Sequence, residues 1–172
     1  MVLCLTIVCL VCSSLLAVVN AMTEEPIKVA KEKETAESLQ RVLPEGGELS
    51  EELTNGDFKY YTLSENGVVK AYAVKTQEIG FGGPLVLMVG VLNDGTVYNT
   101  AVLEHSETPG LGAKCTSDVH FMEQFKGFGP EKKLLVTKDG GDVDAITAST
   151  ITSRAYTKAV SKAVEMVKSL ND

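Results

Sequence analysis

The chain has 172 residues, with 16 lysines and arginines against 23 aspartates and glutamates, which gives a formal net charge of −7. Binding to a nucleic-acid backbone needs a basic surface, so this acidic balance argues against a nucleic-acid partner. Hydrophobic residues make up 44% and charged residues 23% of the sequence, a composition that excludes a largely disordered chain. The length suits one domain of roughly 100–150 residues with an appendage.

The N-terminal segment from Val2 to Val19 contains no charged residue. A helix that crosses a bilayer needs about 20 mostly apolar residues, and this run with the three that follow reaches that length. A cleaved secretory signal is the alternative, because residues 19–21 resemble a small-residue cleavage site. The run is longer than the apolar part of a signal peptide and no basic residue precedes it, so residues 1–22 are predicted to be a retained transmembrane anchor in lipid.

Charge gives little information on orientation. Lys28, Lys31 and Lys33 follow the predicted anchor, and nothing basic precedes it. The positive-inside rule would therefore place the rest of the chain in the cytoplasm. Because there is almost no N-terminal flank to compare, charge alone leaves the side of the membrane open.

Three of the four cysteines lie in the apolar run, which leaves Cys115 without a partner for a disulfide in the rest of the chain. Cys115, His105 and His120 also lack the closely paired spacing of zinc ligands, so no metal site is predicted. No Ser/His/Asp or Cys/His arrangement is apparent, and no catalytic residue is assigned.

Residues 23–35 are mostly polar and charged, and they are predicted to form a solvated stalk. The folded domain is predicted to cover residues 36–172. Its first element is expected to be a docked helix, because apolar residues recur at helical spacing up to Leu43 before Pro44 ends the segment.

Two hairpins are predicted next. Residues 58–75 and 85–104 each read as two strands around a turn, with Asn66-Gly67 in the first and Asp94-Gly95 in the second. Such dipeptides are strong hairpin signals. The third of these four antiparallel strands is apolar on both faces, which indicates a central strand covered on both sides.

The C-terminal part combines short elements with one long helix. A helix is expected over residues 117–125 and a strand over residues 133–136, followed by a turn. Apolar residues from Tyr156 to Val167 fall on one face of an amphipathic helix. The predicted fold class is therefore α+β, with an antiparallel sheet flanked by helices.

A hydroxyl-rich segment precedes this helix, since five of the seven residues from Thr147 to Ser153 are serine or threonine. One of Thr150, Thr152 or Ser153 is expected to cap the helix. A cap needs only one such residue, so the segment also suggests an anion site at the free N–H groups and positive dipole end of the helix. The G-x-x-x-x-G-K pattern of a P-loop is absent, which argues against nucleotide hydrolysis.

The segment Glu107–Gly112 has two interpretations. Pro109-Gly110 is a turn dipeptide, which favours a plain connection between two elements. Leu111, however, stands between two glycines and offers a flexible apolar contact for a flat ring.

Together these segments resemble a known family. The stretch 144–154 resembles the D-x-I-[ST]-G-A-[ST]-x-T-S signature of domains that carry covalently attached FMN. Residues 105–114 are similar to the second motif of that family, and Gly80–Pro84 before an apolar strand resembles a third. With the anchor, the resemblance covers essentially the whole chain and points to the G subunit of the Rnf electron transport complex.

The resemblance implies that the last threonine of the signature, Thr152, bears FMN through a phosphoester. In the family a separate flavin transferase makes this bond from FAD with Mg²⁺, and the sequence shows no base beside the weakly nucleophilic threonine. Ser149 and Thr150 are assigned to the same cofactor site. Four further positions are expected to line the isoalloxazine ring: Glu107, Thr108, Leu111 and Gly112.

One position departs from the family pattern, because the usual Gly-Ala pair is Ala148-Ser149 here. If the glycine position needs a positive φ, Ala148 would be strained by roughly 1 kcal/mol or more.

The resemblance further implies an electron carrier within a redox-driven ion pump, without independent catalysis. Such a complex moves electrons between ferredoxin and NAD⁺ and translocates Na⁺ or H⁺, so its other membrane subunits are the expected partners. The FMN domain is expected on the outer, periplasmic side of the cytoplasmic (inner) membrane, against the lysine count. Three alternatives remain: a stand-alone extracellular flavin carrier, the related C subunit of the sodium-pumping NADH:quinone reductase, and an anchored binding module without flavin.

Overall fold

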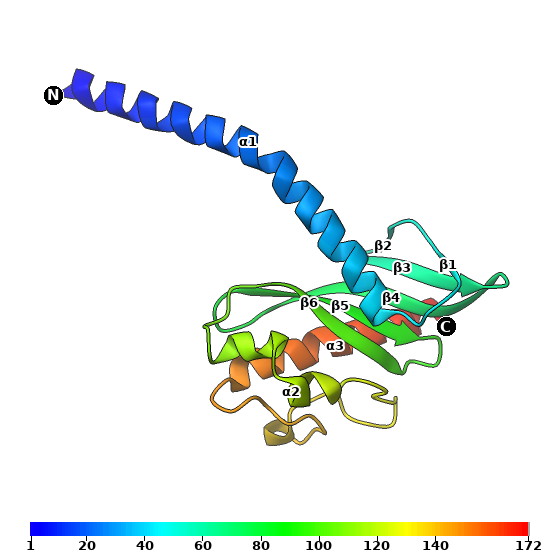
Figure 1. The fold of residues 1–172 in the computed structure, drawn as a ribbon. Helices are drawn as coiled ribbons and strands as arrows, with labels where there is room; N and C mark the ends of the chain where they lie inside the picture. Colours follow the sequence, from blue (N-terminus) through cyan, green and yellow to red (C-terminus); the bar gives the residue numbers. More distant parts are fainter. Residues whose placement is uncertain (172) are drawn as a thin grey trace. The chain divides into compact units, whose positions relative to one another are not determined.

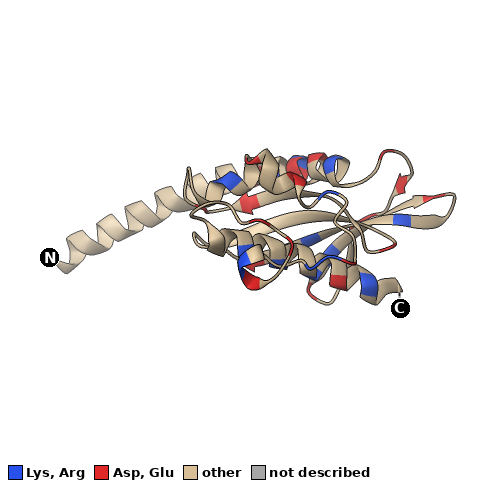
Figure 2. Cartoon of the chain, turned by 90° about the horizontal axis from the view of Figure 1, so that it is seen from below, with Lys and Arg blue, Asp and Glu red and all other residues tan. Residues whose placement is uncertain are grey.

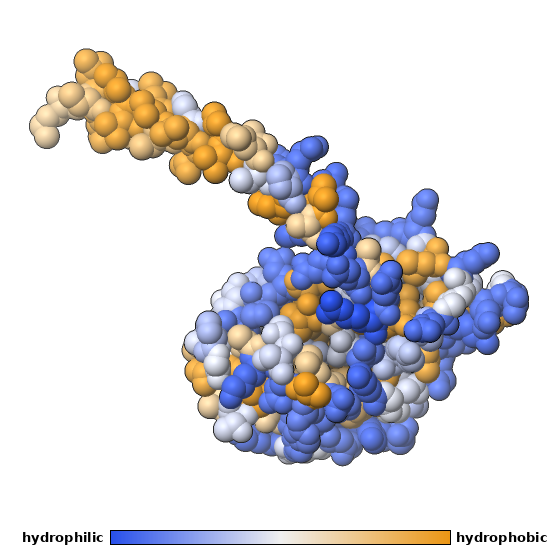
Figure 3. Space-filling view, in the orientation of Figure 1, coloured by the Kyte–Doolittle hydropathy of each residue, from blue (hydrophilic) through white to orange (hydrophobic). Residues whose placement is uncertain are grey.

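The computed structural model describes residues 1–171 and divides into two compact units, residues 1–36 and the residues from Glu37 onward. Helix α1 (Val2–Val42) makes up the first unit and continues into the second, so the residues predicted as a stalk are helical. The N-terminal part of α1 is exposed, and it is long and apolar enough, by length and composition, to cross a membrane. Hydrophobic residues dominate it in Figure 3, and no lysine, arginine or acidic residue occurs there in Figure 2.

The second unit contains one antiparallel sheet in the order β1-β3-β4-β5-β6, with β2 also paired to β3 (Figure 1). The strands are β1 (Glu48–Leu49), β2 (Leu53–Asn55), β3 (Phe58–Glu65), β4 (Val68–Ile79), β5 (Pro84–Leu92) and β6 (Val97–His105). Both predicted hairpins, β3–β4 and β5–β6, are confirmed. Asn66 and Gly67 have φ of 54° and 78°, the positive values that a tight hairpin turn needs.

The central position predicted for the third strand is confirmed as well. β5 lies between β4 and β6, and every residue from Leu85 to Val91 is buried. Such burial on both sides needs a cover on each face of the sheet, because neither row of β5 side chains could face water without a cost.

Helix α3 (Thr150–Asn171) covers one face of the sheet, against β4 and β5 (Figure 1). Its buried face contains Tyr156, Val160 and Val164, which belong to the same core as Leu87 and Val89 of β5. The apolar face predicted for the terminal helix is therefore its packing face. Apart from α1 and α3, the helical elements are short: η1 (Gly112–Thr116), α2 (Val119–Glu123) and η2 (Thr137–Asp139).

The last residues of α1 cover the opposite face. Leu39, Val42 and Leu43 pack with residues of β3, β4 and β5, among them Ala73 and Met88. This confirms the docked first helix. The sheet of the second unit is therefore a middle layer between α3 and residues 37–43.

The prediction of a strand over residues 133–136 is wrong. Only a single bridge, between Val136 and Val143, forms there. The backbone N–H of Lys133 instead donates to the side chain of Asp142, and the N–H of Asp142 donates back to the Lys133 carbonyl. The segment is therefore held by a local loop and never reaches the edge strand β6, although its residue types favour a strand.

We expect Gly90→Ala to destabilise the domain by about 1–3 kcal/mol, the usual cost of overpacking. A Cβ at Gly90 would overlap the backbone carbonyl of Val42, which cannot move without lifting the end of α1 from the sheet. Urea unfolding measures the effect. Gly67→Ala is the control, because its Cβ would meet nothing within 4 Å and only its positive φ of 78° is unfavourable. Equal losses in the two variants would contradict the close approach.

Candidate functional site

A cavity of about 330 Å³ lies where α3 begins. Three segments that are distant in the sequence form its wall: the loop after β4, the loop after β6, and the start of α3. The lining residues are Phe81, Glu107, Thr108, Leu111, Gly112, Ala148, Ser149, Thr150, Ile151 and Thr152. The structure thus brings together all of the residues that the sequence assigned to the cofactor site.

Large apolar side chains stand exposed around this cavity. Phe81 is 71% exposed, Leu111 is 45% exposed and Ile151 is 50% exposed. Each comes from a different one of the three segments. Together they offer apolar walls to a flat ring, which agrees with the ring contact expected of Leu111.

The start of α3 presents free N–H groups to the cavity. The helix begins at Thr150, within the hydroxyl-rich segment. The expected cap is not found: the hydroxyl of Ser153 binds the N–H of Ile146 and the carbonyl of Ser149, both at 3.0 Å. In the part of the chain that the structure describes, no side chain accepts a hydrogen bond from the first N–H groups of α3. An anion would meet unoccupied donors and the positive end of the helix dipole there.

Ser149 adds a second unsatisfied group. Its side chain is 7% exposed and lines the cavity, and its hydroxyl has no hydrogen-bond partner within residues 1–171. Leaving a buried hydroxyl unpaired costs about 1–3 kcal/mol. A ligand oxygen next to Ser149 would remove that cost.

A lysine that the sequence reasoning missed approaches the same place. The Nζ of Lys138, in η2, donates to the Oγ1 of Thr150 at 3.2 Å. The neighbouring Asp139 is held by both Nε and Nη2 of Arg154 at 2.6 Å, and the bonds from Arg154 lower the pKa of the Asp139 carboxyl. This bidentate pair fastens η2 to α3. No local sequence pattern could have revealed the role of Lys138, because this residue reaches Thr150 only through the folding of the loop between them.

Glu107 and Thr152 line the cavity and are hydrogen-bonded to each other. Thr152 is 1% exposed, and its hydroxyl donates to Oε2 of Glu107 at 2.7 Å. The other carboxylate oxygen accepts from the N–H of Gly82 at 3.3 Å. The sequence assigned Glu107 to the flavin ring and showed no base beside Thr152, whereas the structure places the Glu107 carboxylate at the Thr152 hydroxyl.

The backbone of Ala148 is in the left-handed region, with φ of 62°. Its position corresponds to the glycine of the family signature, so the condition stated for strain at this residue is met. An L-residue with a side chain pays roughly 1 kcal/mol or more in this conformation. The strain sits in the turn that feeds the N-terminus of α3 and lines the cavity.

Cys115, the cysteine outside the apolar segment, lies close to Glu107. Cys115 is fully buried, and its burial together with the charge of Glu107 raises the pKa of its thiol to about 11. No group of three or more His, Cys, Asp and Glu residues that could hold a metal ion occurs between residues 1 and 171.

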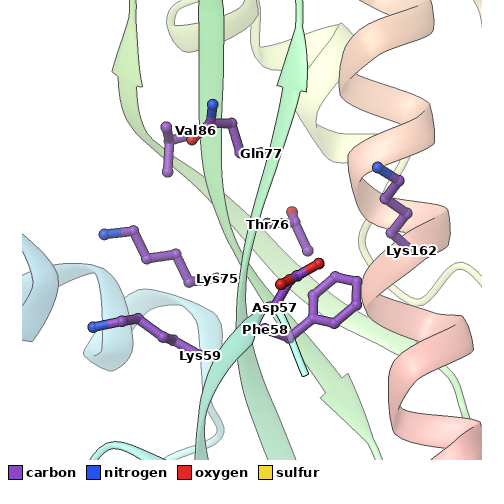
Figure 4. A pocket seen from close by; sticks show the side chains of 8 residues that line it. All are labelled: Asp57, Phe58, Lys59, Lys75, Thr76, Gln77, Val86 and Lys162. Atoms are coloured by element: carbon purple, nitrogen blue, oxygen red, sulfur yellow. The ribbon is translucent and has the colours of Figure 1, made fainter. Parts of the chain in front are cut away.

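A second hollow, of about 360 Å³, lies where β3 begins (Figure 4). In the figure Lys59 and Lys75 extend from one side of the sheet, whereas Lys162 lies on the other side with Thr76. Lys59 bonds to Glu52 at 2.7 Å, and Lys162 is paired with Glu78, so two of the three lysines have internal partners. None of the motif residues lines this hollow.

The fold is similar to the crystal structure of the C subunit of the Na⁺-translocating NADH-quinone reductase from Parabacteroides distasonis, with a TM-score of 0.51 and 27% sequence identity. The similarity covers 67% of this chain and 63% of that chain, so less than two thirds of that protein is matched. Residues 80–165 match the FMN-binding domain family. This range contains all three segments that form the cavity, and the chain is an FMN-binding domain protein.

Comparison with curated relatives identifies the family within the FMN-binding domain proteins more closely. The chain is 36% identical to the G subunit of the proton-translocating ferredoxin:NAD(+) oxidoreductase complex of Clostridium ljungdahlii, over 95% of this chain and 88% of that protein. It is 34% identical to the G subunit of the ion-translocating oxidoreductase complex of Shewanella baltica (93% and 84%). The corresponding G subunit of Methanosarcina acetivorans is 31% identical (95% and 90%). The chain therefore belongs to the family of G subunits of the ion-translocating, Rnf-type oxidoreductase complexes, as its motifs indicated.

We expect Ala148→Gly to stabilise the domain by about 0.5–1 kcal/mol, because glycine adopts a positive φ without steric cost. The gain is smaller than the strain, since glycine also loses more entropy on folding. Thermal or urea unfolding of the full chain in detergent measures it. Ala145→Gly, in the same segment without a positive φ, should only destabilise. A loss of stability in Ala148→Gly would contradict the strained turn.

Proposed function

We propose that this chain is the electron-carrying flavoprotein subunit of an ion-translocating ferredoxin:NAD⁺ oxidoreductase complex that moves Na⁺ or H⁺. The observation that carries the proposal is the cavity at the start of α3, which joins apolar walls to a helix N-terminus and a lysine. An FMN needs both environments, one for its ring and one for its phosphate. The assignment to this complex is supported by the names of the relatives, each of which is the G subunit of an ion-translocating oxidoreductase complex.

The residues around the cavity suit both parts of an FMN. The phosphate would be held by the free N–H groups of α3, the hydroxyl of Ser149 and the Nζ of Lys138. The ring would lie against Leu111 and Phe81, beside Thr108. When bound, the flavin supplies the electron chemistry, and the protein positions it, restricts water and sets its surroundings.

The choice of the threonine that bears FMN depends on charge. The signature named Thr152, whose buried hydroxyl donates to the Glu107 carboxylate. A phosphoester on that oxygen would put a phosphate anion against a buried carboxylate, and like charges at such a distance repel strongly in a protein interior. This contact weighs against attachment at Thr152.

We propose Thr150 as the acceptor instead. It is the first residue of α3, it is only partly buried, and its hydroxyl already receives a bond from Lys138 at 3.2 Å. A phosphate on this oxygen would gain a cation and the free N–H groups, and a transferase could reach it. The flavin transferase, using FAD and Mg²⁺, is the expected partner in this step.

The test is flavin fluorescence of the denatured protein on a gel, after coexpression with a flavin transferase. We expect Thr150→Ala to lose the fluorescence, because no hydroxyl remains to form the bond. Thr152→Val, the matched control, should keep most of it. The reverse pattern would identify Thr152 as the acceptor, and a wild-type chain without flavin would contradict the proposed function.

Lys138 should support loading. We expect Lys138→Gln to lower the flavin content several-fold at limiting transferase, since the phosphate loses a charge-assisted bond. Lys133→Gln removes a lysine from the same loop, where the hydrogen bonds between Lys133 and Asp142 involve only the backbone of Lys133. Equal loading in both variants would contradict a role of Lys138 in holding the phosphate.

We further propose that residues 1–22 remain as a single membrane anchor and that the domain lies on the outer side of the cytoplasmic membrane. The length and exposure of the apolar part of α1 support the anchor, and the family resemblance supports the side. A C-terminal alkaline phosphatase fusion should be active in membranes, because that enzyme needs an oxidising compartment. The opposite result would place the domain in the cytoplasm: an inactive phosphatase fusion, together with fluorescence from a second fusion to a reporter that fluoresces only in the cytoplasm.

A further inference from the structure

Glu107 is the one charged side chain among the residues that line the cavity. It is 6% exposed, and burying a carboxylate is costly unless a cation or good donors compensate. Within residues 1–171 no lysine, arginine or histidine forms an ion pair with it. Among the residues that the structure describes, its two oxygens accept hydrogen bonds only from the Thr152 hydroxyl and the Gly82 N–H.

The surrounding backbone is shaped around this carboxylate. A Cβ on Gly80 would overlap its Oε1, and a Cβ on Gly112 would overlap its Oε2. Two glycines from different loops therefore leave space for the charge. Burial of this carboxylate costs energy, no cation compensates it, and two loops leave space for it. Such an arrangement indicates a role in function rather than in stability.

The groups near Glu107 do not cancel its charge. His105 accepts the backbone N–H of Glu107 at Nδ1, at 3.2 Å, and in this bond it acts as an acceptor. Cys115 carries a thiol whose pKa is raised to about 11 by burial and by Glu107, so it stays neutral near pH 7. Lys138 binds Thr150 at the phosphate end of the cavity.

We propose that Glu107 lowers the midpoint potential of the flavin, with Thr152 limiting the size of the effect. This inference rests on the proposed function. Reduction by two electrons and one proton leaves the ring with a net negative charge, and a fixed carboxylate in a poorly solvated cavity makes that state less favourable. The Thr152 hydroxyl withdraws part of the carboxylate charge through its hydrogen bond.

Redox titration of the full, flavin-loaded chain in detergent tests this. We expect Glu107→Gln, which keeps the shape and removes the charge, to shift the midpoint potential in the positive direction. Thr152→Val, which keeps the volume and removes the donor, should shift it in the negative direction. Glu123→Gln removes an exposed carboxylate outside the cavity and should leave the potential unchanged.

Opposite signs distinguish an electrostatic role from a structural one, because a loosened site would move both variants in the same direction. A loaded Glu107→Gln protein with the wild-type potential overturns the inference while the proposed function stands. If that variant takes up no flavin, an unchanged or raised potential in Thr152→Val overturns it. Failure of both variants to load also overturns it, since the pair would then serve assembly of the site. A wild-type chain without flavin is a separate failure, that of the proposed function.

Discussion

The hydrogen bonds of one buried carboxylate hold the candidate site together. Glu107 lies on the loop after β6, and it binds Thr152 on α3 and the backbone of Gly82 after β4. Within the described part of the chain, no other side chain is hydrogen-bonded across all three segments, so Glu107 is the point that links them.

The frame that supports this contact is the core between the sheet and α3. Tyr156 lies one helical turn after Thr152, and its hydroxyl forms a 2.7 Å hydrogen bond with Thr100 of β6. Its ring also contacts Phe121 and Phe125, at centroid distances of 5.1 and 4.8 Å. Aromatic contacts of this kind fix both the rotation of α3 and the position of α2. Thr152 is thereby kept pointing inward, whereas Thr150 remains accessible at the end of the helix.

The same site contains energetically unfavourable features, whose cost is compensated by the stability of the rest of the domain. Ala148 is held at a positive φ, Ser149 has an unpaired hydroxyl, and Glu107 is buried without a cation. Strain and unsatisfied groups tend to collect where a ligand is bound, because the ligand can relieve them. Their concentration in two segments that line one cavity supports a cofactor site more strongly than any single residue of the motif.

The sequence alone determined the elements whose signals are local. Runs of strand-type residues around turn dipeptides specified the two hairpins, helical periodicity specified α3, and uniform apolarity specified the N-terminal part of α1. The motifs also named residues that do meet in one cavity. Local residue types failed for residues 133–136, where bonds to Asp142 fold the segment into a loop. Only the tertiary structure decided that Lys138 reaches Thr150, that Glu107 bonds to Thr152, and which threonine is buried. These features join residues 12 to 45 positions apart. Their distances follow from the packing of α3 on the sheet, and no periodicity or spacing in the sequence encodes such distances directly.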